Sequence, residues 1–319
     1  MYRYYTLKPE IYLILTGSYA TIAFPGQFPY YVSMISQNQL QYSTHGSGSP
    51  KTLIISGVHG NERTGQIIID RLLKNLPTFS GTLTILPVAN PTGFTNNTRV
   101  ESVSGLDLNR NFFDSGDGPG NQIIKAILHL VRRQDFIFDL HNFKTDGLVQ
   151  VVSNHIGASD TVAMLFQPDL VRTSGGNGSL KKTGTLTQYT KDANISYLLF
   201  ELPIEHKLSQ TQIDKILSGF RDFLSGSHEE TNTTKKSFND LPRVAIRVIK
   251  AEISGVFSKN ERLVLEDIVS FGEILGTITF NETRKEIRSP CKGIVCELDQ
   301  EETREVKVGD TLLAIGEPF

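Results

Sequence analysis

The chain alternates short apolar runs with helix-like patterns, and this alternation limits the folds open to it more than any other feature. Buried-strand patterns occupy 51–56, 82–88, 135–140, 148–152 and 195–200. Apolar residues at helical spacing lie between them, at 64–76, 121–133, 158–172 and 210–224. Strands that alternate with helices of this length predict an α/β domain whose sheet is mixed but largely parallel and carries helices on both faces.

The pattern changes after 225–240, a polar segment with almost nothing to bury, which is typical of a linker. Beyond it, short strands recur between glycines and form an internal repeat. Its first copy contains Val269, Gly272, Glu273, Leu275 and Ile278, and its second contains Val306, Gly309, Asp310, Leu312 and Ile315. Two such copies predict a small all-β domain of two interlocked halves, whereas two unrelated strands that end in Gly-acidic turns are the alternative. We therefore expect domains at 1–228 and 241–319, joined by a linker at 229–240.

Composition excludes several classes of protein. Lys plus Arg is 32 and Asp plus Glu is 34, so the net charge of −2 gives no case for a nucleic-acid or anionic-membrane partner. No apolar run approaches the roughly 18–20 residues of a membrane-spanning helix. The short run 11–15 follows Glu10, so we interpret it as a strand, with a secretory signal as the alternative. Only two cysteines occur, Cys291 and Cys296, which favours a reduced, cytoplasmic protein.

The strongest chemical motif is Ser-Gly-Val-His-Gly-Asn-Glu at 56–62, between a buried strand and a helix. A spacing of three places His59 and Glu62 on one side of the first helical turn, where both can reach one ion. Gly57 and Gly60 let the backbone turn sharply and approach closely. A catalytic zinc site uses three such nitrogen and oxygen ligands and leaves a fourth position to water. A solvated pair on a helix surface is the alternative interpretation.

A second histidine supplies a third ligand. His141 follows the strand 135–140, at the carboxyl edge where open α/β sheets bind ligands, and the loop of His59 leaves its strand at the same edge. Asp139 lies two residues earlier and points to the same face, so it could accept the second imidazole N–H and fix the tautomer. A satisfied core histidine and a carboxylate that caps nearby backbone are the alternatives.

A third motif, at 105–112, carries Asn109 and Arg110 between large apolar residues. Arginine binds a carboxylate in a bidentate fork and asparagine adds a donor, so this pair is a candidate for binding an anionic group. A structural pair between Arg110 and Asp107 is the alternative. Arg99 lies earlier, in a polar loop where solvation alone would explain it.

Glu201 directly follows the apolar run 195–200, at the carboxyl end of a predicted strand. A carboxylate in that position is partly desolvated, which suits a general base, although glutamates at strand edges are common without such a role. The glycine-rich loop at 174–184 lacks the Gly-Lys-Ser/Thr ending of a phosphate loop. We therefore reject nucleotide binding and expect this loop to border the site.

Taken in order, Gly-x-His-Gly-x-Glu, Ala-Asn-Pro, Asp-Leu-Asn-Arg-x-Phe, Asp-Leu-His and Phe-Glu-Leu resemble the zinc carboxypeptidase superfamily. More narrowly, the set resembles the succinylglutamate desuccinylase/aspartoacylase branch, over roughly residues 45–205. The resemblance implies a zinc carboxypeptidase-like catalytic domain followed by a small barrel-sandwich domain related to lipoyl and biotinyl carriers. The C-terminal segment lacks the Met-Lys-Met of a biotin acceptor, so we expect no carrier function.

The resemblance also implies roles for particular residues. One zinc ion per chain would be held by His59, Glu62 and His141. Glu201 matches the position of the catalytic glutamate of the family.

Other residues match the family's substrate contacts. Asn109 and Arg110 match its pair that grips a substrate carboxylate. Arg99 matches the arginine that polarises the scissile carbonyl. Lys191 is a candidate contact to a second substrate carboxylate.

The implied activity is that of a zinc-dependent amidohydrolase, a deacylase of a small N-acyl amino acid or related carboxylate-bearing amide. A metallocarboxypeptidase acting on peptide or peptidoglycan C-termini would use the same ligands and is the nearest alternative. A non-catalytic binding protein with a relic metal site is the second. The expected partner is a small N-acyl amino acid or short peptide, without nucleic acid or membrane, and assembly as a homo-oligomer stays open.

Overall fold

The computed structural model describes residues 3–8, 11–16, 19–23, 30–32, 40–172, 184–226, 238–299 and 301–318, with backbone alone before residue 40. The N-terminal strands are β1 (Arg3–Lys8), β2 (Ile11–Thr16), β3 (Tyr19–Ala23) and β4 (Tyr30–Val32). They form a separate antiparallel sheet. The strand predicted at 11–15 is therefore confirmed. No helix among the described residues is long and apolar enough to cross a membrane.

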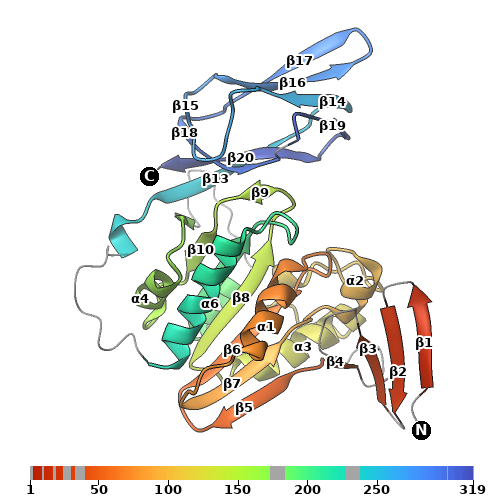
Figure 1. Cartoon of the computed structure of the whole chain (residues 1–319), viewed down its shortest axis with the longest axis vertical. Coiled ribbons are helices and arrows are strands. Elements are labelled where there is room, and N and C mark those ends of the chain that lie inside the picture. The colour runs from red at the N-terminus through yellow and green to blue at the C-terminus, as the bar shows by residue number, and fades with distance from the viewer. Residues whose placement is uncertain are drawn as a thin grey trace.

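The central sheet runs in the order β11-β10-β12-β8-β6-β7-β5 (Figure 1). Its strands are β5 (Ser43–Ser47), β6 (Lys51–Ser56), β7 (Gly81–Leu86), β8 (Phe136–Asn142), β10 (Gln150–Ser153), β11 (Leu170–Arg172) and β12 (Ser196–Leu202). The pairs β6–β7, β6–β8, β8–β12 and β10–β11 are parallel, while β5–β7 and β10–β12 are antiparallel. The predicted mixed, largely parallel sheet is confirmed.

Helices cover both faces of this sheet, as predicted. One face packs against α1 (Thr64–Lys74), α4 (Ser159–Ala163) and α6 (Gln210–Leu224). The other packs against α3 (Pro119–Val131) and α5 (Leu186–Asp192), and α2 (Pro91–Asn96) follows the next loop. Adjacent side chains of β6 point to opposite faces of the sheet, so Ile54 packs in the first core and Ile55 in the second. The sheet is therefore buried on both sides.

The helix predicted over 158–172 is wrong in its second half. Here α4 gives way to a 3-10 turn at Met164–Phe166, and β11 begins at Leu170. Gln167 adopts the left-handed conformation with φ of 46°, and Pro168 cannot continue a helix. The chain is thereby redirected into the sheet beside β10, so Arg172 ends a strand rather than a helix.

The C-terminal region is all-β, as predicted. Its strands are β13 (Arg243–Lys250), β14 (Gly255–Lys259), β15 (Ile268–Val269), β16 (Ile274–Phe280), β17 (Thr283–Arg288), β18 (Gly293–Leu298), β19 (Thr303–Val306) and β20 (Thr311–Pro318). One sheet is β17-β16-β14-β19, while β15-β18-β20-β13 continues the central sheet. A buried core of their own lies between them. Closure into a barrel-sandwich stays a prediction.

The internal repeat appears as two matching turns. Gly272 and Gly309 both adopt positive φ, 79° and 90°. In the first turn the Glu273 carboxylate accepts a hydrogen bond from the Ser270 amide at 2.8 Å, and in the second Asp310 accepts one from Lys307 at 2.8 Å. The sequence match therefore reflects equivalent local structure rather than coincidence.

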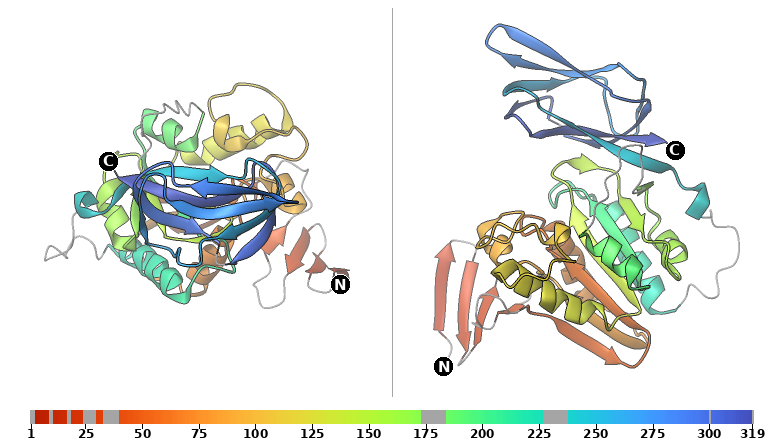
Figure 2. Two further views of the ribbon diagram at one scale, coloured as in Figure 1. Left: turned by 90° about the horizontal axis from the view of Figure 1, so that it is seen from above. Right: turned by 180° about the vertical axis from the view of Figure 1, so that it is seen from behind.

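The two regions are joined by strand pairing. β13 pairs in parallel with β11, and β18 pairs with β9 (Asp146–Gly147) of the α/β region. The C-terminal strands consequently lie over one end of the α/β region, which is clear from above (Figure 2). Phe238, in the segment predicted as a linker, is buried against the first core, while residues 227–237 lie outside the described part of the chain.

Candidate metal site and catalytic pocket

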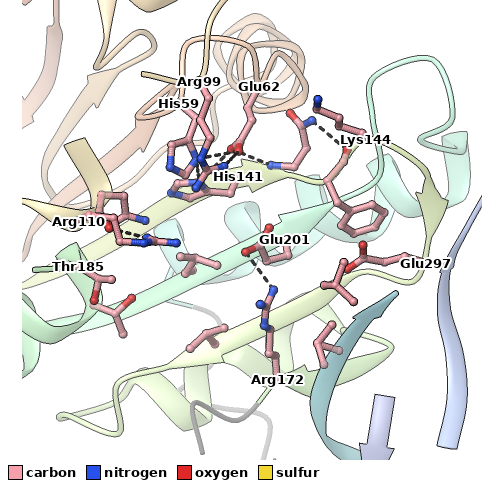
Figure 3. Close-up of a pocket in the computed structure, with 18 of the residues that line it drawn as sticks. His59, Glu62, Arg99, Arg110, His141, Lys144, Arg172, Thr185, Glu201 and Glu297 are labelled. Atoms are coloured by element: carbon pink, nitrogen blue, oxygen red, sulfur yellow. Dashed lines mark hydrogen bonds and ion pairs between the residues drawn. The ribbon is translucent and has the colours of Figure 1, made fainter. Parts of the chain in front are cut away.

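Two glycines give the loop after β6 a backbone path that residues with a Cβ atom could not follow. Gly57 has a φ of +65°, and a Cβ on Gly60 would lie 2.0 Å from a backbone carbon of Gly93. The expected sharp turn and close approach are both present. They carry the chain straight from the buried strand into α1, with His59 and Glu62 on the inner side of the turn (Figure 3).

His59, Glu62 and His141 converge at the carboxyl edge of β6 and β8 (Figure 3). All three are buried, and their ligand atoms lie within 4.8 Å of one another. Glu62 Oε1 is 2.7 Å from His59 Nδ1, and Glu62 Oε2 is 2.9 Å from His141 Nδ1. The two Nδ1 atoms are 3.1 Å apart. The structure thus brings together the three side chains that the sequence placed on one ion.

The opposite nitrogens of both imidazoles face carboxylates. His59 Nε2 lies 3.3 Å from Asp107 Oδ1, and His141 Nε2 lies 3.2 Å from Asp139 Oδ2. A carboxylate there favours the tautomer that is protonated at Nε2, and it leaves the lone pair of each Nδ1 directed at the centre. Two imidazole nitrogens and one carboxylate oxygen are a donor set that zinc accepts. The residues present therefore fit a zinc ion.

The charges around this centre favour a cation. Burial alone would raise the pKa of Glu62, but His141 and His59 outweigh it and hold that pKa well below its usual range. Burial would lower the pKa of His141, but Asp139 and Glu62 outweigh it and raise that pKa well above its usual range. The buried Tyr197 donates a hydrogen bond to Asp139 Oδ2 at 2.8 Å. These carboxylates around the two imidazoles would stabilise a divalent ion.

Asp107 has a position that the sequence did not predict. Its ion pair is with Arg99, whose Nε lies 3.2 Å from Oδ2, rather than with Arg110. It also accepts a hydrogen bond from the Asn109 amide at 3.0 Å. Burial alone would raise the pKa of Asp107, but His59, Arg99 and Arg110 outweigh it and hold that pKa well below its usual range. The only sequence signal was its place at the start of the Asp-Leu-Asn-Arg motif.

Glu201 lies directly beside His141, because β12 and β8 pair in parallel with these two residues in register. Residues in register on neighbouring strands point to the same face. The Glu201 side chain is half-buried and lines the same pocket as the metal-ligand candidates. Its Oε1 accepts a hydrogen bond from Arg172 Nη1 at 3.2 Å.

The three candidate substrate contacts line this pocket as well. Arg99 is 45% exposed, and its Nη1 lies 3.5 Å from Glu62 Oε1, so its guanidinium borders the metal-ligand candidates. Asn109 is buried, and its Oδ1 accepts a hydrogen bond from the Leu186 amide, which leaves the side-chain nitrogen as a donor. Arg110 is exposed and reaches back to the Asn109 carbonyl at 2.6 Å.

The pocket has a volume of about 1480 Å³ and is walled on one side by the C-terminal strands. Arg247 of β13 and Glu297 of β18 are among its lining residues, as is Lys191. Sequence reasoning missed Arg172 and Glu297, since neither stands in a motif. The loop predicted at 174–184 falls almost wholly outside the described residues, although Thr185 just beyond it lines the pocket.

Glu297 is a buried titratable group that the C-terminal region adds to this pocket. It is 5% exposed, and its Oε1 accepts a hydrogen bond from Gln150 Nε2 at 3.3 Å. Burial raises the pKa of Glu297 to about 7; the charge of Glu201 raises it too, whereas Arg172 and the Gln150 hydrogen bond oppose the shift.

Solved structures with this fold come from several bacteria. A succinylglutamate desuccinylase/aspartoacylase from Rhodobacter sphaeroides is 20% identical, with a TM-score of 0.67 over 91% of this chain and 89% of its own. An aspartoacylase family protein from Mesorhizobium loti is also 20% identical, with a TM-score of 0.67 over 100% and 98%. The ectoine utilization protein EutE from Ruegeria pomeroyi is 16% identical, with a TM-score of 0.69 over 99% and 98%. At these identities the similarity establishes the fold alone.

A search of curated proteins found no match. A family model does match: residues 48–226 fit the succinylglutamate desuccinylase/aspartoacylase catalytic domain. The matched segment contains His59, Glu62, His141 and Glu201, together with the strands and loops that position them. The chain therefore belongs to the succinylglutamate desuccinylase/aspartoacylase family of hydrolases.

Proposed function

We propose that the protein is a zinc-dependent amidohydrolase that removes the acyl group from a small N-acyl amino acid or related carboxylate-bearing amide. One observation carries the proposal: the buried ligand atoms of His59, Glu62 and His141 lie within 4.8 Å of one another. Membership of a family named for two deacylases supports the reaction class.

The roles of the residues follow from their positions. One zinc ion per chain, held by His59, Glu62 and His141, would polarise the scissile carbonyl and make a water acidic enough to deprotonate near neutral pH. Glu201, beside His141 on the next strand, would accept the proton of the attacking water and pass it to the leaving nitrogen. The ion pair with Arg172, whose Nη1 lies 3.2 Å from Oε1, would hold the Glu201 carboxylate in position for this step.

The cationic residues would orient the substrate. Arg99, beside Glu62, would stabilise negative charge that develops on the carbonyl oxygen, an interaction worth roughly 3–4 kcal/mol in other hydrolases. Arg110 and the side-chain nitrogen of Asn109 would bind the free carboxylate and so hold the amide in place.

The domain organisation supports a small substrate. We propose a catalytic domain at 1–228, a linker at 229–240 and a C-terminal β domain at 241–319 of barrel-sandwich type. The last contributes a wall of the pocket, which restricts access for long peptides and favours deacylation over carboxypeptidase activity. The two cysteines are buried and unpaired, which supports a cytoplasmic location.

Metal analysis combined with a substrate panel tests the proposal. The panel contains N-acetyl and N-succinyl amino acids beside short peptides with a free C-terminus. We expect stoichiometric zinc and hydrolysis of acyl amino acids, which a chelator abolishes and added zinc restores. Hydrolysis of the peptides alone would instead establish the carboxypeptidase, and a protein that binds no zinc and cleaves neither class would contradict the proposal.

A further inference from the structure

Arg63 connects the loop of the metal-ligand candidates with the loop of Arg99. It directly follows Glu62 and stands at the N-cap of α1, where its side chain makes no capping hydrogen bond to the helix. Instead, the guanidinium carbon lies 3.4 Å from the ring centroid of Phe94, and Nη2 donates a hydrogen bond to the Phe94 carbonyl at 2.5 Å. The planar guanidinium can stack on an aromatic ring and donate a hydrogen bond together, a combination for which lysine lacks the planar group.

The Phe94 carbonyl belongs to the last turn of α2. The same oxygen accepts a hydrogen bond from the Asn97 amide at 3.3 Å. The neighbouring Gly93 carbonyl accepts one from the Thr98 amide at 2.8 Å. Asn97 adopts the left-handed conformation that ends the helix. These bonds set the direction in which the chain leaves α2, and Arg99 is the residue that follows Thr98.

The two loops are also in contact through their backbones, at Gly60 and Gly93. The Arg63 contact to Phe94 is thus a second point of attachment between the loop after β6 and α2. The guanidinium is partly withdrawn from water. Burial lowers the pKa of Arg63, and the negative charge of Glu205, in the loop after β12, opposes that shift. Arg63 is therefore held by protein groups rather than directed freely into solvent.

Arg99 needs such support, because its described side-chain contacts leave it half in solvent. Its side chain is 45% exposed, and its Nη1 lies 3.5 Å from Glu62 Oε1, at the outer limit of a hydrogen bond (Figure 3). Its Nε lies 3.2 Å from Asp107 Oδ2. A long, half-exposed side chain has many conformations, so the guanidinium returns to one place only if the backbone that carries it is held.

We propose that Arg63 is a positioning residue for Arg99: by holding the Phe94 carbonyl, it fixes the turn from which Arg99 reaches the scissile carbonyl of the substrate. The proposal rests on the role proposed above for Arg99. Arg63 then acts through Arg99 rather than on the reacting atoms. A displacement of about 1 Å in a catalytic group can lower the rate by roughly 10²-fold, so the loss of this attachment should be measurable.

Hydrogen exchange tests the structural half of the proposal without any substrate. R63M removes the donor and the charge and keeps most of the length of the side chain. We expect the amides of Asn97 and Thr98 to exchange roughly 10-fold faster in R63M, since a hydrogen bond from a charged group has at least that strength. R63K keeps a charged donor and should give an intermediate rate.

The control R71M makes the same change further along α1, at an arginine outside the pocket that donates to Gln210 Oε1. It should leave the exchange of this turn as in the wild type. Unchanged exchange at Asn97 and Thr98 in R63M overturns the proposal, whatever the activity of the variant.

A double-mutant cycle tests the catalytic half. R99M should lower kcat by roughly 10²- to 10³-fold, as the loss of an oxyanion donor does in other hydrolases. R63M should lower kcat by roughly 10-fold with KM nearly unchanged, in the range of a modest displacement. The double variant R63M/R99M should be no slower than R99M, because Arg63 acts through Arg99. Two factors that multiply in the double variant would overturn the proposal. A change confined to KM would do so too, since Arg63 would then be a substrate contact.

Metal analysis and the wild-type assay separate this proposal from the function on which it rests. R63M and R99M should bind as much zinc as the wild type, and loss of zinc in R63M would show that Arg63 supports the metal loop instead. An R99M enzyme as active as the wild type would contradict the role of Arg99 and the proposal with it. A wild type that hydrolyses no acyl amino acid would contradict the deacylase, whereas hydrogen exchange would still decide whether Arg63 holds the turn before Arg99.

Discussion

Two parts of the pocket are built in opposite ways. One, the metal end, holds the metal-ligand candidates His59, Glu62 and His141, and the other, the Glu297 end, holds Glu297. At the metal end, each imidazole has a carboxylate behind it, and one of those carboxylates also accepts a hydrogen bond from Tyr197. At the other end, Glu297 is equally buried; in the described part of the chain it accepts a hydrogen bond from the neutral amide of Gln150, and the charge of Arg172 acts on it as well. The first end therefore holds several charged groups close together, whereas burial is the main influence on the single carboxylate of the second end. The first end carries the groups to which we assign the chemistry, and the second adds a buried carboxyl group from the C-terminal region to the same pocket.

The largest effect is expected at the metal end. H141A removes one of the three proposed zinc ligands, so zinc content and hydrolysis should both fall to background. Atomic emission and a deacylation assay measure the two. The control H129A removes an exposed histidine of α3 and should change neither. Full zinc occupancy in H141A would show that the ion lies elsewhere.

The next effect concerns Glu201, which lies between the two ends. E201Q should lower kcat by roughly 10²- to 10⁴-fold, because the amide cannot accept the proton of the attacking water. Zinc content should remain that of the wild type, since Glu201 is not among the ligand candidates. Unchanged turnover in E201Q would remove the base from the mechanism.

A third prediction uses pH to examine the Glu297 end. Its pKa rises from 4.5 to about 7 on folding, so the folded state binds this proton more tightly than the unfolded state does. Stability should therefore fall as pH rises from 4.5 to 7, by up to about 3 kcal/mol, and stay lower above that range. The groups that face Glu297 are Arg172 on β11, Glu201 on β12 and Gln150 on β10.

E297Q should remove that pH dependence, because the amide does not ionise. The Tm of E297Q should exceed that of the wild type more at pH 8 than at pH 5. The control E305Q changes an exposed carboxylate of β19, outside the pocket, and should follow the wild type at both pH values. A Tm difference that does not change with pH would mean that Glu297 is already well solvated or well paired.

The smallest effect is expected at Asp107, which faces one of the proposed metal ligands. D107N keeps the shape of the side chain but loses the charge that faces His59 Nε2, so zinc affinity should fall by about 10- to 100-fold. Competition with a chelator measures it. D117N, which changes an exposed carboxylate before α3, serves as the control. An unchanged affinity in D107N would show that Asp107 only caps its own loop.

Much of the fold could be predicted from local pattern. The strand at 51–56 and the helix at 210–224 coincide with β6 and α6, because burial on both faces and an amphipathic period are written in consecutive residues. The error at 158–172 had a local cause as well. Apolar residues before and after Pro168 continue a helical period, but the proline and the left-handed Gln167 end the helix.

By itself, the sequence determined the residues of the metal end. His59 and Glu62 share one loop, and His141 ends a recognisable strand, so spacing and strand edges were enough to place them together. Only the tertiary structure decided the other end. The order of strands in the sheet places Arg172 against Glu201. The pairing of β18 with β9 places Glu297 in the same pocket. Such pairings depend on the packing of distant segments, and no spacing along the chain encodes them.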